Sequence, residues 1–137
     1  MNQAARAYFQ TSVTTTTPGS LVVMLYDGAI KFLQQAKKKM AEKDYAQKGI
    51  LISKALDIIA ELDGSLNLER GGDVAENLHK MYFFCSTQLL KANLQMDQEL
   101  IDKVIDVLKG VRSAFAEIVV QSPEVAKTTS LGASAYR

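Results

Sequence analysis

The chain has 137 residues, of which 47% are hydrophobic and 23% charged, and its formal net charge is +1. These values are typical of one globular domain, and they exclude the basic surface that a nucleic acid or an acidic membrane would attract. A single cysteine excludes an internal disulfide, and no apolar run approaches the roughly 20 residues needed to cross a bilayer. We therefore expect a cytoplasmic protein that neither binds nucleic acid nor inserts into a membrane.

Residues 1–16 form an arm rich in threonine and alanine, which we expect to be mobile. The arm ends where Thr17 can cap a helix and Pro18 can occupy the first helical position. Apolar residues then follow at helical spacing, which predicts a first helix over about 18–40. Its apolar face consists of Leu21, Leu25, Ala29, Phe32 and Ala36.

A second and a third helix are predicted on either side of a glycine pair. Asp44 can cap the second, over about 45–66, and Asp73 can cap the third, over about 73–96, after Gly71-Gly72 breaks the chain. The apolar positions of the second helix are Leu51, Ile52, Ala55, Ile58, Ile59, Leu62 and Leu66. Those of the third are Leu78, Tyr82, Cys85, Leu89, Ala92 and Met96.

Asp97 ends the third helix and caps a fourth over about 98–121, which has its own apolar seam. Helices of about 23 residues are roughly 35 Å long, and short connections between equal helices favour antiparallel neighbours. The fold predicted for 17–121 is therefore all-α, an antiparallel up-down-up-down four-helix bundle. The tail, 122–137, is small and polar, and we expect it to be disordered.

The sequence offers little for catalysis or metal binding. Glu76 and His79 have the Glu-x-x-His spacing of di-iron bundles, but His79 is the only histidine and the facing positions are aliphatic. Cys85 lies on an apolar seam with no histidine at seam spacing to activate it. We expect no catalytic residue, no metal and no cofactor, and a metal-binding bundle is the least favoured alternative.

Two groups of residues leave a choice between packing and binding. Gly28, inside the first helix, allows either close packing within the bundle or a groove for a partner segment. Tyr26, Tyr82 and Asn93 are polar groups beside apolar ones, and they need hydrogen-bond partners. These partners are either one another, tying helices together, or the backbone of a bound peptide.

Several motifs together resemble one known family. Thr17-Pro18-Gly19, followed by Met24-Leu25-Tyr26-Asp27-Gly28-Ala29, is similar to the opening of the flagellin export chaperone family, FliS. The resemblance covers roughly residues 7–120. The other motifs, in the family's order, are Ala7-Tyr8, Ser12-Val13, Ser53-Lys54-Ala55, Ile58-Ile59-Ala60-Glu61-Leu62, Gly71-Gly72, Ala75-Glu76-Asn77-Leu78, Lys91-Ala92-Asn93-Leu94 and Asp97.

The chain also departs from the family pattern. Tyr82-Phe83-Phe84-Cys85 stands where the family usually has Tyr-Asp-Tyr-Met. Ser86 and Thr87 replace its usual paired arginines, and Phe115 stands in place of a late tryptophan. Roles that depend on those arginines or on that tryptophan are not carried over to this chain.

The resemblance implies a cytoplasmic chaperone that binds the C-terminal segment of flagellin, prevents premature polymerisation and assists export through the flagellar type III apparatus. Binding would be helix-in-groove recognition with coupled folding. Further implied partners are a component of the export gate and a co-chaperone or FliW-like regulator. The alternative is a flagellar adaptor or regulator that binds another partner on the same surface.

The expected flagellin-binding residues are Tyr8, Leu21, Leu25, Tyr26, Gly28, Ile58, Tyr82 and Asn93. Among them Tyr8 has a distinct expected role. Because an open apolar groove would expose a large patch, we expect Tyr8 and Phe9 to cover part of it until flagellin displaces them.

Overall fold

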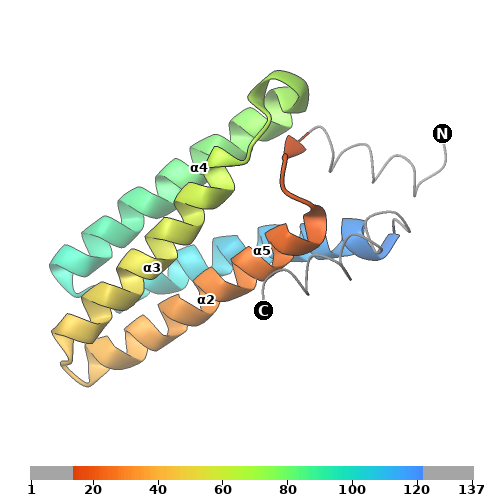
Figure 1. The fold of residues 1–137 in the computed structure, drawn as a ribbon. Helices are drawn as coiled ribbons and strands as arrows, with labels where there is room; N and C mark the ends of the chain where they lie inside the picture. The colour runs from red at the N-terminus through yellow and green to blue at the C-terminus, as the bar shows by residue number, and fades with distance from the viewer. Residues whose placement is uncertain (1–13, 122–137) are drawn as a thin grey trace.

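The computed structural model describes residues 14–121, with side chains described through Glu117. Its helices are α2 (Gly19–Ala41), α3 (Tyr45–Gly64), α4 (Leu68–Gln95) and α5 (Gln98–Gln121). Successive helices run side by side in opposite directions and are joined by short connections (Figure 1). The structure therefore confirms the all-α, up-down-up-down four-helix bundle.

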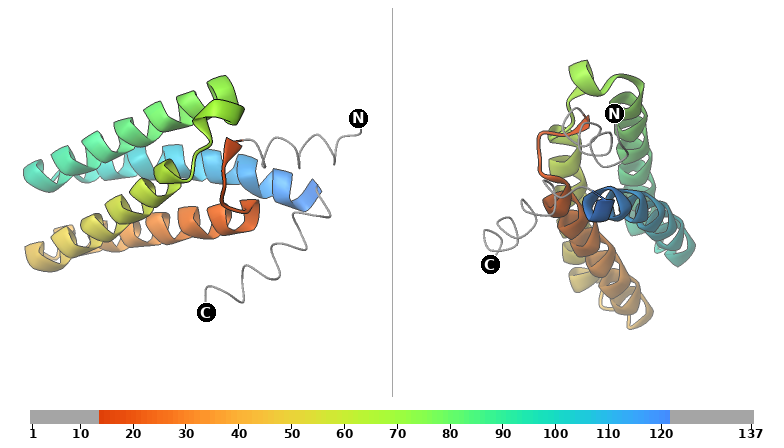
Figure 2. Two further views of the ribbon diagram at one scale, coloured as in Figure 1. Left: turned by 45° about the horizontal axis from the view of Figure 1, so that its top comes forward. Right: turned by 90° about the vertical axis from the view of Figure 1, so that its right-hand side faces the viewer.

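The core lies between the four helices. α2 packs against α3 and α5, and α4 packs against the same two helices from the opposite corner (Figure 2). Most of the expected seam positions are buried here, which is why the spacing of three and four residues predicted the bundle. The most completely buried large side chains are Tyr26, Leu33, Ile52, Ile59, Leu62, Leu89, Ile101 and Leu108. No helix in the described part of the chain has the length and low charge of a membrane span.

Two of the expected aspartate caps are confirmed. The Asp44 carboxylate accepts a hydrogen bond of 3.2 Å from the backbone N–H of Gln47 at the start of α3. The Asp97 carboxylate accepts bonds of 3.0 and 3.2 Å from the N–H groups of Glu99 and Leu100 at the start of α5. In each case the side chain satisfies donors that the first helical turn leaves unpaired.

The start of α2 differs from the prediction. Pro18 is the N-cap, with non-helical φ −53° and ψ 142°, and no side chain caps the helix, so the predictions of a Thr17 cap and a proline at the first helical position were wrong. The reason is that the residues before Pro18 follow an extended path with bonds of their own. The Thr17 N–H, for example, donates to the Thr15 hydroxyl at 3.2 Å.

The start of α4 also differs. The helix was expected from residue 73 with an Asp73 cap, but it begins at Leu68, because Asn67 accepts a bond of 3.0 Å from the N–H of Arg70. The glycine break lies inside this helix as a kink at Gly72, whose φ of 53° and ψ of −132° suit only glycine. A helical turn thus precedes the predicted break instead of a loop.

One seam residue was assigned wrongly. Met96 was expected to continue the apolar face of the third helix, but it is 42% exposed. It is the left-handed C-cap of α4, with φ 54° and ψ 45°, so its side chain no longer follows the helical period.

The last residues of the expected arm, 14–16, pair with the α3–α4 connection. The Thr16 N–H donates to the Ser65 carbonyl at 2.8 Å, and the Asn67 N–H donates to the Thr14 carbonyl at 2.9 Å. The Thr15 and Ser65 hydroxyls lie 2.9 Å apart. The chain therefore enters α2 from beside the end of α3 (Figure 1). The rest of the arm, with Tyr8, and the tail lie outside the described residues.

Candidate functional site

A cavity of about 170 Å³ opens between α3 and α4. Its α3 side is lined by Ile59, Ala60 and Asp63, and its α4 side by His79, Tyr82, Phe83 and Ser86. The residues at its rim are exposed, so the cavity is one part of a longer surface that follows the two helices. We call this surface, with the two walls described next, the α3–α4 groove.

The α3 wall carries small side chains. Ser53 and Gly49 precede Ala60 by seven and eleven residues, so the three lie along one strip of the helix. A Cβ atom added at Gly49 would meet no atom within 4 Å. This wall is therefore low and leaves room for an approaching chain.

The α4 wall carries large apolar side chains that the bundle does not bury. Phe83 is 71% exposed, Leu90 54% and Leu94 83%. They are spaced by seven and four residues, which places them in one row on the helix. A row of apolar side chains beside a low wall is the kind of surface that receives an amphipathic helix.

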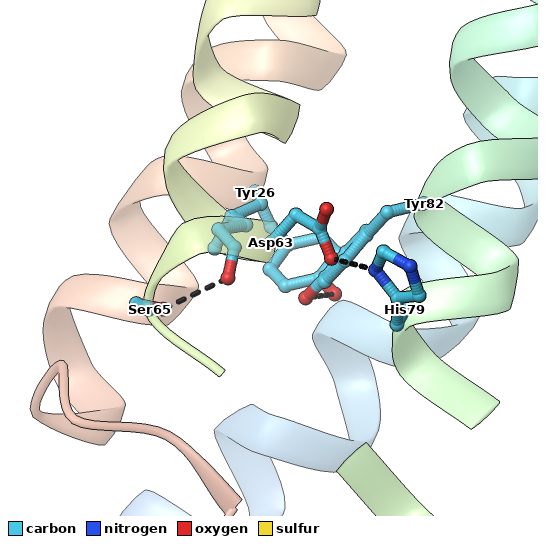
Figure 3. A network of polar contacts seen from close by, with 6 residues as sticks. Tyr26, Asp63, Ser65, His79 and Tyr82 are labelled. Carbon is cyan, nitrogen blue, oxygen red and sulfur yellow. Dashed lines mark hydrogen bonds and ion pairs between the residues drawn. The ribbon is translucent and has the colours of Figure 1, made fainter. Parts of the chain in front are cut away.

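The floor of the groove is built on two tyrosines (Figure 3). The Tyr26 hydroxyl from α2 and the Tyr82 hydroxyl from α4 lie 2.6 Å apart in a hydrogen bond, and both side chains are buried. Burial raises the pKa of Tyr82 to about 12 and raises that of Tyr26 further, so both phenols stay protonated near neutral pH. The Phe115 ring packs on Tyr26, with centroids 6.0 Å apart.

Polar pairs join α3 to α4 at both ends of the groove. At one end the Asp63 carboxylate lies 2.6 Å from Nδ1 of His79, above the tyrosine pair (Figure 3). At the other end the buried ammonium of Lys48 donates to the side-chain and backbone oxygens of Asn93, at 2.6 and 3.0 Å. Each pair therefore links α3 to α4 across the groove.

The other predicted binding residues lie on a different face, between α2 and α3. A Cβ atom at Gly28 would stand 3.3 Å from Cδ1 of Ile58, so the glycine allows these two helices to pack closely. Leu21 is half-buried on the same side of α2, and Leu25 is buried in the core. Of the two interpretations of Gly28, close packing within the bundle is therefore the one that the structure shows.

The tyrosines and Asn93 likewise have partners within the bundle. Of the eight predicted residues, Tyr82 lines the cavity, Tyr26 supports it and Asn93 lies at one end. Sequence reasoning missed Phe83, Leu90 and Leu94. The sequence contained a partial signal, because they are among the apolar residues that remain on this helix once its seam is assigned.

The site contains little that could carry catalysis. Among residues 14–121 no three His, Cys, Asp or Glu side chains gather closely enough to hold a metal ion. The motif residue Glu76 pairs with Lys80 at 3.4 Å, whereas His79 pairs with Asp63. Burial raises the pKa of the Cys85 thiol to about 11, so it stays protonated.

The family model described as "Flagellar protein FliS" matches residues 1–122. The flagellar secretion chaperone FliS of Vibrio cholerae is 37% identical over 122 residues, which cover 86% of this chain and 90% of the relative. FliSB of Pseudomonas aeruginosa is 35% identical, covering 84% and 91%, and FliS of Salmonella typhimurium is 34% identical, covering 83% and 85%. Because the family model matches residues 1–122 and these relatives match over most of their length, the chain belongs to the FliS family of flagellar proteins.

Proposed function

We propose that this protein is a cytoplasmic flagellar secretion chaperone, without enzymatic activity, that binds the C-terminal segment of flagellin. Its relatives carry the name flagellar secretion chaperone, which supports the general role. Binding would cover apolar surface on flagellin, prevent premature polymerisation and present the segment to a component of the type III export gate. A co-chaperone or a FliW-like regulator would act on the same complex.

The observation that carries this proposal is the α3–α4 groove. Folding a disordered segment on binding costs about 2–5 kcal/mol of the gross interaction, so the chaperone must offer a long apolar contact. The row of Phe83, Leu90 and Leu94 spans three turns of α4 opposite the low α3 wall. A helical segment that lies along this row would bury side chains that the free bundle leaves exposed.

The predicted residues then divide into three proposed roles. Tyr82 is the floor of the groove, Tyr26 holds Tyr82 from below, and Asn93 fixes one end through Lys48. On the second face, the half-buried Leu21 and Ile58 would contact a segment long enough to continue around α3. Leu25 and Gly28 would support this face from within the bundle. Tyr8 remains a proposed cover of the groove.

Titration with a flagellin C-terminal peptide tests the proposal. We expect binding, a circular dichroism signal of the mixture that exceeds the sum of its parts in helix, and a negative heat-capacity change by calorimetry as apolar surface is buried. Peptides from other flagellar proteins serve as the comparison. Binding without a gain of helix would contradict coupled folding, and preference for another flagellar protein would favour the adaptor alternative.

Two further substitutions test the absence of catalysis. We expect His79→Ala and Cys85→Ser to leave peptide affinity within about twofold, because in the described part of the chain neither residue belongs to a group that could hold a metal ion, the His79–Asp63 pair is exposed, and Cys85 is buried. Cys85→Ser should lower the free energy of unfolding by about 1–3 kcal/mol, because it buries a hydroxyl on the seam. Denaturant unfolding gives the stability and calorimetry the affinity. Loss of affinity at unchanged stability, in either variant, would count against a purely non-catalytic site.

A further inference from the structure

The first turn of α2 presents hydrogen-bond donors without acceptors. The N–H groups of Leu21 and Val22 donate to the carbonyl of Pro18, at 3.0 and 3.1 Å. Within residues 14–121 the N–H groups of Gly19 and Ser20 have no such acceptor, and no side chain caps the helix. These two donors stand at the positive end of the dipole of a 23-residue helix.

Ser20 adds a third donor at the same end. Ser20 is 3% exposed, and its hydroxyl has no hydrogen-bond partner among the residues that the structure describes. A buried hydroxyl without a partner costs free energy, so native proteins rarely retain one unless something meets it. Ser20 thus marks a place where an acceptor is missing.

Comparison with the other helices makes the omission specific. α3, α4 and α5 are each preceded by a capping residue whose side chain accepts a hydrogen bond from a backbone N–H; these residues are Asp44, Asn67 and Asp97. α4 and α5 also carry a glutamate in the first turn. Of the four described helices only α2 has neither a side-chain cap nor an acid in its first turn.

We propose that the N-terminus of α2 is a carboxylate-binding site whose donors are the N–H groups of Gly19 and Ser20 and the Ser20 hydroxyl. A carboxylate has only acceptors, carries the charge that the dipole attracts and offers two oxygens for several donors. It can come from this chain or from the segment that the chaperone binds.

If the carboxylate comes from this chain, the first acid in the sequence after α5 is Glu124. Two ion pairs, Asp27–Arg112 and Lys37–Asp102, join α2 to α5. The second pair lies ten residues later on α2 and ten residues earlier on α5, so the two helices are antiparallel and in constant register. Continued to its end, this register brings the start of α2 beside the last turn of α5, which ends at Gln121. Glu124 follows three residues later in the sequence, within about 10 Å of extended chain.

Ser20→Ala tests the site through the sign of its effect. If a carboxylate occupies the site in the free chain, the substitution removes a charge-assisted hydrogen bond and lowers the melting temperature by a few degrees. If the hydroxyl merely lacks a partner, alanine removes a buried unpaired group and is the better helix former, so the melting temperature rises. Ser53→Ala is the control: at this exposed position inside α3, any change in melting temperature reports only the higher helix propensity of alanine.

Two comparisons identify the source. For an internal source, Glu124→Gln lowers the melting temperature of the free chain, and Ser20→Ala adds no further loss in that background. The partner source rests on the proposed function. In that case Ser20→Ala lowers the affinity for the flagellin peptide about tenfold, but leaves unchanged the affinity for a peptide whose carboxylates are amidated. A raised melting temperature together with unchanged peptide affinity overturns the site. If the unsubstituted chain does not bind the peptide, the proposed function fails, and the free-chain melting temperatures alone decide the inference.

Discussion

Leu90→Glu should weaken binding of the flagellin C-terminal peptide by about 100-fold or more. Leu90 lies in the middle of the apolar row on α4, so a helix in the α3–α4 groove would cover the new carboxylate and remove it from water without a partner. A loss of this size corresponds to about 2.7 kcal/mol. Because Leu90 is 54% exposed in the free chain, the fold itself should tolerate the substitution. Calorimetric titration measures the affinity.

Phe84→Glu is the matched control. Phe84 is 47% exposed on the same helix, but it precedes Leu90 by six residues and therefore projects from a different side of α4. We expect this variant to bind the peptide within a few-fold of the unsubstituted chain. The opposite pattern, in which Phe84→Glu loses binding and Leu90→Glu retains it, would place the flagellin site on another face of the bundle.

The tyrosine pair should show strong energetic coupling. Tyr26→Phe and Tyr82→Phe should each lower the free energy of unfolding by about 1–3 kcal/mol, because each leaves the other hydroxyl buried without its partner. The double substitution removes both hydroxyls and keeps both rings, so its loss should be smaller than the sum of the single losses. Denaturant unfolding of the four proteins measures this coupling.

The same variants separate the two interpretations of the tyrosines. If their hydroxyls serve only the bundle, Tyr82→Phe should bind the flagellin peptide with nearly unchanged affinity, because the ring still forms the floor of the groove. A large loss of affinity for Tyr82→Phe would show that its hydroxyl meets the bound peptide. Additive stability losses would mean that the hydroxyl pair contributes nothing as a pair.

Much of the fold could be predicted from local chemistry. The seams follow from apolar spacing, and the caps at Asp44 and Asp97 from a side chain that competes for the next few N–H groups. The start of α2 could not be predicted in this way, because the preceding threonines bond to Ser65, about 50 residues away. The prediction that Met96 is buried was wrong for a related reason: a left-handed cap interrupts the helical period there, and no glycine marks it in the sequence.

The candidate site was less accessible to sequence reasoning. Polar groups near an apolar seam indicate that hydrogen bonds exist, but the partner of each comes from the packing of whole helices. Tyr26 meets Tyr82, and Asn93 meets Lys48, across separations of 45 residues or more. Gly28 was recognised as significant, yet only the position of Ile58 shows that it serves packing.

A pair of glycine substitutions tests most directly whether the α3–α4 groove receives flagellin. A Cβ atom at Gly49 or at Gly110 would meet nothing within 4 Å, so leucine at either position should stabilise its helix, by up to about 1 kcal/mol. Only Gly49 lies on the wall of the groove. We expect Gly49→Leu to lower the affinity for the flagellin peptide at least about tenfold while the fold becomes more stable. Gly110→Leu should bind the peptide with unchanged affinity. Equal peptide affinity for the two variants would contradict the groove as the binding site.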